Sequence, residues 1–266
     1  MSKTGRVSAG VALVAVTLAA AFGSVSPAHA KKPDVSSSLM TPGKIVVGMD
    51  VPYPPFEFRN RSGLTGFDVQ LVKALARELE LGVEFRDTGF DTIFTDLSRG
   101  KFDLVASATT VTPERKRVVR FTRPNYIPLQ SLVTRPRSGI RSLKSLRGAT
   151  VGVQRGTTGA AFAFRRLKRA RIVQFSDVPT AIRALKGGRV DAVVTDQVAV
   201  RGTREVRIVR SFSTGEKYAY AVAKASTDLL HGLNWALNRL KRNGTFGKIY
   251  RRWFGIAPPP ALRYRP

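Results

Sequence analysis

The sequence contains no cysteine, and this absence removes several functions at once. Disulfide bridges, thiolate metal sites and cysteine nucleophiles are excluded. Histidine is almost as scarce, because only His29 and His231 occur among 266 residues. No pairing of a histidine with a cysteine nucleophile, and no cluster of metal ligands, can be assembled from this composition. We therefore expect neither a metal nor another cofactor.

Acidic residues are the second scarcity. Lysine and arginine total 45 against 18 aspartate and glutamate residues, which gives a net charge of +27. Such an excess indicates either an anionic partner, such as nucleic acid, a cell-wall polymer or lipid headgroups, or only a heavily solvated surface. The basic run Arg165–Arg171 has no interleaved aromatic residue that would stack on bases, so we expect no nucleic-acid binding. A cell-surface polymer or lipid stays open as a partner.

Long hydrophobic runs are also missing. The apolar stretch over residues 9–22 is shorter than the ~20 residues that span a bilayer, and no second such run follows. It lies after Lys3 and Arg6 and before Ala28-His29-Ala30, which is the pattern of a signal peptide with its cleavage site. We predict that residues 1–30 are a signal peptide and that the mature chain is periplasmic or extracellular. Without a cysteine to carry a lipid, we expect no lipoprotein.

After this segment, strands and helices alternate. Residues 31–43 lack hydrophobic periodicity and predict a flexible leader. Strands are predicted over 45–49, 83–86 and 103–106, with helices over 69–80 and 91–99 between them. Such alternation predicts a parallel sheet whose functional side chains follow the carboxyl ends of the strands.

The same order then occurs a second time. Residues 149–153 repeat the pattern of 45–49, and residues 185–194 repeat that of 97–106. Two copies of one unit predict two α/β lobes, each a sheet flanked by helices, with a cleft between them.

Two segments without periodicity, Asn125–Leu129 and Thr214–Tyr218, are predicted to cross between these lobes as hinges. We predict a first lobe from residues 44–125 and 219–257, a second lobe from residues 126–218, and a tail over residues 258–266.

The stretch from Asp103 to Arg115 is the strongest candidate for a binding site. Thr112 suits a helix N-cap and Pro113 the first helical position, so Arg115 falls in the first turn beside free backbone N–H groups. A guanidinium, threonine hydroxyls and helix-end amides together suit a carboxylate. Taken alone, the motif also fits a surface arginine that solvates a helix end.

Order and spacing of several motifs favour the binding interpretation. Over residues 44–256 the chain resembles the periplasmic polar amino-acid-binding proteins of ABC importers, solute-binding family 3, of the glutamine-, histidine- and lysine/arginine/ornithine-binding type. The resemblance rests on Asp50 with Pro55–Phe58, Gly66–Asp68, Asp103–Arg115, Val151–Val153 with Gly156–Thr158, Asp191–Asp196, and Asn243–Phe246 with Tyr250–Gly255.

This resemblance implies a two-lobed, type II periplasmic-binding-protein-like fold that closes on its ligand by a hinge motion. It also implies a monomer that delivers an amino acid to an ABC importer permease. Arg115 and Thr110 would hold the α-carboxylate, and Asp196 the α-ammonium. The full set of expected ligand-binding residues is Asp50, Tyr53, Phe90, Ser107, Ala108, Thr110, Arg115, Gln154, Thr157, Thr158 and Asp196, with Tyr53 and Phe90 enclosing the ligand side chain.

The residues near the ligand side chain favour one chemical class. Asp50 would repel an acidic side chain, and Gln154 supplies no positive charge, so we expect a polar neutral or cationic amino acid. Arg155 would invert this preference if its side chain entered the cleft.

An enzyme is the alternative, since the fold also resembles cyclohexadienyl dehydratases. Asp50, Asp68 and Asp196 could perform acid–base chemistry. His231 lies on a predicted helix away from every strand end, and binding therefore remains the favoured interpretation.

Overall fold

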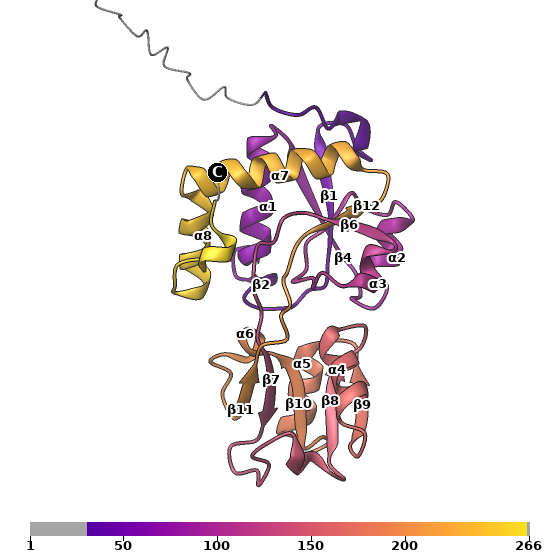
Figure 1. Cartoon of the computed structure of the whole chain (residues 1–266), viewed down its shortest axis with the longest axis vertical. Coiled ribbons are helices and arrows are strands. Elements are labelled where there is room, and N and C mark those ends of the chain that lie inside the picture. The colour runs from indigo at the N-terminus through magenta and orange to yellow at the C-terminus, as the bar shows by residue number, and fades with distance from the viewer. Residues whose placement is uncertain (1–30, 265–266) are drawn as a thin grey trace, which may run out of the picture. The chain divides into compact units, whose positions relative to one another are not determined.

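The computed structural model describes residues 31–264, and the predicted signal peptide lies outside this range. Residues 32–264 belong to one compact unit built around two five-stranded sheets (Figure 1). We call each sheet with its helices a lobe. Within the described residues, no helix is long and apolar enough to cross a membrane.

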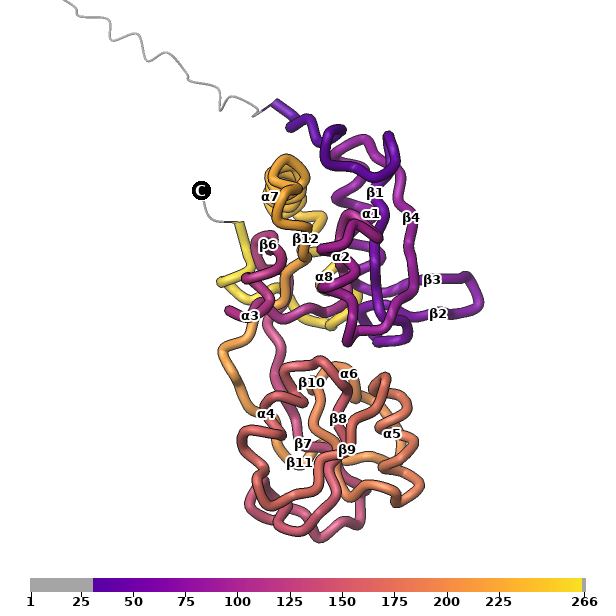
Figure 2. The backbone as a smooth tube through the Cα atoms, turned by 90° about the vertical axis from the view of Figure 1, so that its right-hand side faces the viewer, coloured from indigo at the N-terminus to yellow at the C-terminus, as the bar shows by residue number. Residues whose placement is uncertain are grey.

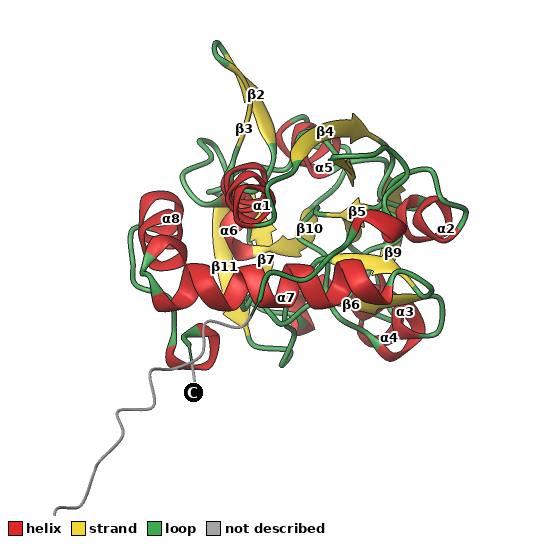
Figure 3. Cartoon of the chain, turned by 90° about the horizontal axis from the view of Figure 1, so that it is seen from above, coloured by secondary structure: helices red, strands yellow, loops and turns green. Residues whose placement is uncertain are grey.

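The first lobe has the strand order β4-β1-β5-β12-β6. Its strands are β1 (Lys44–Met49), β4 (Gly82–Asp87), β5 (Leu104–Val105), β6 (Val119–Phe121) and β12 (Ala221–Ala223). Its helices are α1 (Phe67–Glu78), α2 (Ile93–Ser98), α3 (Pro113–Lys116), α7 (Thr227–Arg242) and α8 (Thr245–Phe254), and a hairpin of β2 (Phe58–Asn60) and β3 (Gly63–Thr65) precedes α1. Figure 3 shows α1, α7 and α8 gathered together, where they pack against one another.

The second lobe has the order β11-β7-β10-β8-β9. Its strands are β7 (Gln130–Thr134), β8 (Thr150–Gln154), β9 (Arg171–Phe175), β10 (Ala192–Asp196) and β11 (Arg207–Phe212), and its helices are α4 (Thr158–Arg166), α5 (Val178–Lys186) and α6 (Gln197–Val200). Short 3-10 turns occupy Ser36–Ser38, Lys144–Leu146 and Pro260–Leu262. The expected α/β class, with two sheets flanked by helices, is confirmed.

Both faces of the second sheet are covered, which explains the continuous apolar run of β10. Val194 packs in a cluster with residues of α4, whereas its neighbour Val193 packs in the cluster that contains residues of α5. Successive side chains on a strand point to opposite faces, so a strand buried on both sides has no polar alternation.

The internal repeat has a structural counterpart in two equivalent aspartates. Asp103 accepts the backbone N–H of Val46 at 2.8 Å, and Asp191 accepts that of Thr150, also at 2.8 Å. Each carboxylate therefore joins the central strand of its own lobe to the strand beside it. The similarity of the two sequence segments reflects this shared role.

The sheets are not wholly parallel, in contrast to the prediction. β12 runs antiparallel to β5 and β6, and β7 runs antiparallel to β10 and β11. β7 and β12 are the two strands that follow a crossing between the lobes. Because they enter their lobe at the edge where the other strands end, they run in the opposite direction.

The two crossings lie side by side between the lobes (Figure 2). The chain passes from β6 to β7 and from β11 to β12, and the predicted segments fall within these connections. Tyr218 donates its N–H to Tyr126 and accepts the N–H of Asn125, both at 2.9 Å. The rings of Tyr126 and Tyr218 pack with Phe56 and Phe254, which places an aromatic cluster beside the crossings. The lobe boundaries given above remain a prediction.

The segments at the two ends are more ordered than their sequences indicate. In the predicted leader, Val35 is 4% exposed and packs so close to α7 that a Cβ at Gly232 would lie 2.5 Å from it. The N–H of Met40 is held by Asp103 at 2.8 Å. In the predicted tail, Leu262 is 1% exposed. A single buried residue in a polar segment produces no periodic pattern, so the sequence could not reveal either contact.

Candidate functional site

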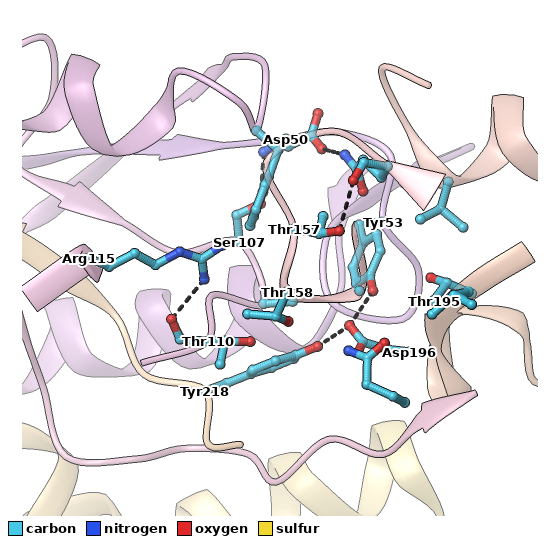
Figure 4. A pocket seen from close by; sticks show the side chains of 17 residues that line it. Asp50, Tyr53, Ser107, Thr110, Arg115, Thr157, Thr158, Thr195, Asp196 and Tyr218 are labelled. Atoms are coloured by element: carbon cyan, nitrogen blue, oxygen red, sulfur yellow. Dashed lines mark hydrogen bonds between the residues drawn. The ribbon is translucent and has the colours of Figure 1, made fainter. Parts of the chain in front are cut away.

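A pocket lies between the two lobes, and side chains from both line it (Figure 4). All eleven residues expected at the site are among those that line it: Asp50, Tyr53, Phe90, Ser107, Ala108, Thr110, Arg115, Gln154, Thr157, Thr158 and Asp196. The structure thus brings together residues that are up to 146 positions apart in the chain. Their individual roles toward a ligand stay predictions.

Arg115 is held at the pocket by the helix start that the sequence predicts. The Thr112 side chain accepts the N–H of Arg115 at 3.2 Å and caps α3. The guanidinium donates to the carbonyl of Thr110 at 2.7 Å and, across the cleft, to that of Gly156 at 3.1 Å. It also lies over the rings of Phe94 and Phe90, at 4.5 and 5.3 Å. Burial lowers the pKa of Arg115 to about 10, so the group remains charged at neutral pH. The alternative of a merely solvated surface arginine does not fit these contacts.

The facing turn of the second lobe begins α4. Thr157 caps this helix by accepting the N–H of Ala160 at 3.0 Å, and its hydroxyl donates to the backbone carbonyl of Gln154 at 2.8 Å. Gly156 has φ of +75°, and a Cβ there would lie 3.0 Å from the Cα of Asp91 in the first lobe. A glycine is required here both by the backbone conformation and by the close approach of the lobes.

Asp196 ends β10 and is surrounded by neutral donors. Its carboxylate accepts hydrogen bonds from the hydroxyls of Tyr53, at 2.6 Å, and Tyr218, and from Nε2 of Gln130 at 2.6 Å. Burial raises the pKa of Asp196 to about 6, although the two tyrosine hydrogen bonds act in the other direction. A cationic ligand group would strongly stabilise the ionised form of a buried carboxylate whose pKa is raised in this way.

Asp50 follows β1 at another part of the pocket. Its N–H donates to Oγ of Ser107 at 2.9 Å, and its carboxylate accepts from Nε2 of Gln154 at 2.6 Å. Burial raises the pKa of Asp50 to about 6, and the charges of nearby Asp87, Asp177 and Asp91 add to this shift. This part of the site is therefore acidic.

Arg155 does not invert that charge. Its side chain forms an ion pair with Asp91 at 3.0 Å and does not line the pocket. The ligand preference expected from Asp50 and Gln154 therefore stands as a proposal.

Six residues that line the pocket are outside the expected set: Gln130, Gly159, Val178, Val194, Thr195 and Tyr218. Tyr218 and Gln130 lie in or directly after the crossing segments. A polar residue directly after the first crossing and an aromatic residue within the second were therefore the available signal. Val178 begins α5 and Val194 lies near the end of β10; both are buried apolar residues, and nothing in the sequence distinguishes them from core residues.

Histidine takes no part in the site. His231 is exposed on α7, and the residues that line the pocket include no histidine. In the part of the chain that the structure describes, no group of three or more histidine, aspartate or glutamate side chains could hold a metal ion.

Comparison with known proteins gives consistent matches. The sequence pattern of the family described as bacterial extracellular solute-binding proteins, family 3, matches residues 45–256. The arginine-binding extracellular protein ArtP of Bacillus subtilis (strain 168) is 32% identical over 225 residues, which cover 79% of this chain and 86% of that protein.

Two solved structures are similar in both fold and sequence. An ancestral arginine-binding protein bound to glutamine has a TM-score of 0.77 and 40% identity, and the match covers 81% of this chain and 100% of that one. The ancestral amino-acid-binding protein AncCDT-1, described as a precursor of cyclohexadienyl dehydratase, has a TM-score of 0.74 and 38% identity, with 80% and 95% coverage.

Proposed function

Because the chain belongs to the bacterial extracellular solute-binding proteins of family 3, we propose that it captures an L-amino acid between its lobes and delivers it to the permease of an ABC importer. The expected two-lobed fold of the type II periplasmic binding proteins is confirmed by the same matches. Members of this family are extracellular proteins, so this chain is an exported protein.

The single observation that carries the proposal is the pairing of opposite charges in one pocket. Arg115 of the first lobe and Asp196 of the second lobe both line this pocket. A guanidinium suits the α-carboxylate of an amino acid, and a buried carboxylate suits its α-ammonium. Closure of the lobes would remove both pairs from water and strengthen them.

The ligand side chain is assigned by the second carboxylate. Asp50 and its acidic neighbours favour a group that donates hydrogen bonds or carries positive charge, such as an amide, ammonium or guanidinium. The aliphatic part of such a side chain would lie between Tyr53 and Phe90, which both line the pocket. The relatives described as arginine-binding, and the ancestral protein bound to glutamine, support this class. A glutamate side chain would meet like charge.

Catalysis is the second candidate, favoured by the similarity to a dehydratase precursor. Asp50 and Asp196, each with a pKa raised to about 6, have the acidity of acid–base catalysts. Both already have binding roles in the proposal, and we propose that the chain binds without turning its ligand over. Incubation with prephenate and with arogenate tests this, since product formation would establish the enzymatic alternative.

Export and assembly complete the proposal. We propose that residues 1–30 are removed as a signal peptide, that the mature protein is not a lipoprotein, and that it acts as a monomer. Mass spectrometry of the mature protein and light scattering with and without ligand test these statements. An N-terminus other than Lys31, or a stable dimer, would contradict them.

Part of the high positive charge of the chain is concentrated in one groove on the second lobe. A groove there is lined by five cationic and four apolar side chains and by no acidic one: Leu143, Lys144, Leu146, Arg147, Arg166, Leu167, Lys168, Arg169 and Ala170. We propose that it contacts an anionic group of the cell surface, carried by a polymer or by lipid headgroups.

A charge-matched pair of variants tests this contact. Replacing the five cationic groove residues by glutamine should weaken binding to anionic lipid vesicles or to soluble polyphosphate. The control replaces five exposed cationic residues of the first lobe, Arg59, Arg61, Arg77, Arg99 and Lys248, and changes the net charge equally. Equal losses in both variants would show that only the total charge matters.

Thermal-shift measurements against the twenty amino acids test the main proposal. A ligand present at 100 times its dissociation constant adds about 2.7 kcal/mol of apparent stability. We expect the largest shifts from arginine, lysine, histidine or glutamine. Shifts from none of the twenty would contradict the proposal.

A further inference from the structure

Two carboxyl groups lie buried beside the pocket without lining it. Glu57 follows the proline-containing loop after β1, and Asp68 is in the first turn of α1; they are 0% and 1% exposed. The two side chains are close enough for each to shift the pKa of the other. Among the described residues, no lysine or arginine is hydrogen-bonded or ion-paired to either. Two ionised carboxylates in such a place would repel each other with no compensating charge.

The hydrogen bonds indicate which group holds a proton. Oδ1 of Asp68 accepts the hydroxyl of Tyr220, and Oδ2 accepts the N–H of Ala108, both at 2.9 Å. Oε1 of Glu57 accepts the hydroxyl of Ser107 at 2.6 Å, whereas its Oε2 is fully buried and has no donor. A proton on Oε2 would make this unpartnered oxygen a hydrogen-bond donor.

The electrostatic surroundings point the same way. Burial raises the pKa of Glu57 well above its ordinary value, and the charges of Asp68 and Asp50 add to the shift. Burial raises the pKa of Asp68 to about 6, while the N–H of Ala108 and the hydroxyl of Tyr220 act against it. The pKa of Tyr220 is itself raised, so this neighbour stays a donor. These shifts favour ionisation of Asp68 before Glu57.

We propose that Glu57 remains protonated at neutral pH, donates its proton in a hydrogen bond to ionised Asp68, and with it positions the Ser107–Ala108 turn against the ligand. Ala108 has φ of +45°, a conformation that alanine rarely adopts, and Asp68 holds its N–H there. Ser107 is held by Glu57 and in turn accepts the N–H of Asp50 at 2.9 Å. The pair thus supports three residues that line the pocket, and both members are positioning residues.

Infrared difference spectroscopy of the ligand-free protein tests the protonation directly. The wild-type spectrum minus that of Glu57→Gln at pH 7.5 should contain the C=O band of a protonated carboxyl group. Glu80→Gln is the control, because the Glu80 side chain is 76% exposed and its difference spectrum should contain only ionised carboxylate bands. The same ionised bands in the Glu57→Gln difference would overturn the proposal.

The positioning role rests on the proposed function and is tested by calorimetry with L-arginine. Glutamine reproduces the donor and acceptor of a protonated glutamate, so Glu57→Gln should fold and bind within about threefold of the wild type. Asp68→Asn loses one acceptor and should bind at least about tenfold more weakly. The reverse order, or failure of Glu57→Gln to fold, would overturn the assignment. If the wild type does not bind L-arginine, the same comparison is made with L-lysine or L-glutamine. Binding of none of these would contradict the proposed function, and the infrared measurement would still decide the protonation.

Discussion

Arg155 of the second lobe and Asp91 of the first form an ion pair at 3.0 Å that joins the lobes outside the pocket. Together with the hydrogen bond from Arg115 to the Gly156 carbonyl, it links the two lobes in the arrangement that the structure shows. The two side chains are 54% and 36% exposed, so the pair is screened by solvent.

Loss of this pair should shift the protein toward an open form. Arg155→Gln should raise the dissociation constant by about 1.4- to 5-fold, as expected from ~0.2–1 kcal/mol for an exposed pair, and the difference should shrink at high salt. Calorimetry at two salt concentrations measures this. Lys186→Gln is the matched control, because it also removes one positive charge, breaks the Lys186–Glu205 pair within the second lobe and should leave affinity unchanged. Equal effects of the two variants would contradict a role in closure.

Removal of the Arg115 guanidinium should have a far larger effect. Arg115→Ala should weaken amino-acid binding by about 2–5 kcal/mol, or about 30-fold to several thousand-fold, because the ligand carboxylate loses its charged partner. The fold should survive, as judged by circular dichroism. Arg117→Ala is the control, since Arg117 is exposed at the end of the same helix. Unchanged affinity in Arg115→Ala would exclude the carboxylate contact.

Affinity should depend on pH through the two pocket carboxylates. A bound cationic group lowers the pKa of Asp196 or Asp50 from its ligand-free value of about 6, so the complex holds fewer protons than the free protein. Affinity for L-arginine should therefore be constant above about pH 7 and fall below about pH 6, approaching tenfold per pH unit for each carboxylate. Calorimetric titrations between pH 5 and pH 8 test this on the wild type. Asp196→Asn should show a shallower fall, and an identical pH profile in that variant would remove Asp196 from the account.

Selectivity among ligands should depend on Asp50. Asp50→Asn keeps an oxygen that can accept from Gln154 but loses the negative charge. The variant should bind arginine at least about tenfold more weakly and glutamine within a few-fold of the wild type, because only the guanidinium requires the charge. Parallel loss for both amino acids would indicate that Asp50 supports the pocket and does not select the ligand.

Much of the site could be predicted because its residues lie at strand ends or helix starts. Asp50, Gln154 and Asp196 each follow or end a buried strand, and Thr112 marks the helix start that places Arg115. These signals are local in the sequence, so periodicity and capping rules can find them.

Features that depend on contacts between distant segments could not be predicted in this way. Tyr218 reaches Asp196 because the second crossing lies against the first, and Gln130 reaches it because β7 pairs with β10. The contact of Val35 with α7 depends on Gly232, which a helical pattern would not single out. The shared environment of Glu57 and Asp68 likewise exists only once α1 packs beside the loop after β1.

The central claim is that the pocket between the lobes binds a polar neutral or cationic L-amino acid through Arg115, Asp196 and Asp50. Isothermal titration calorimetry of the wild-type protein with arginine, lysine, glutamine and glutamate tests it most directly. The account predicts saturable one-to-one binding of at least one of the first three and much weaker binding of glutamate. Binding of glutamate alone would contradict the assignment of Asp50, and binding of none of the four would contradict the claim itself.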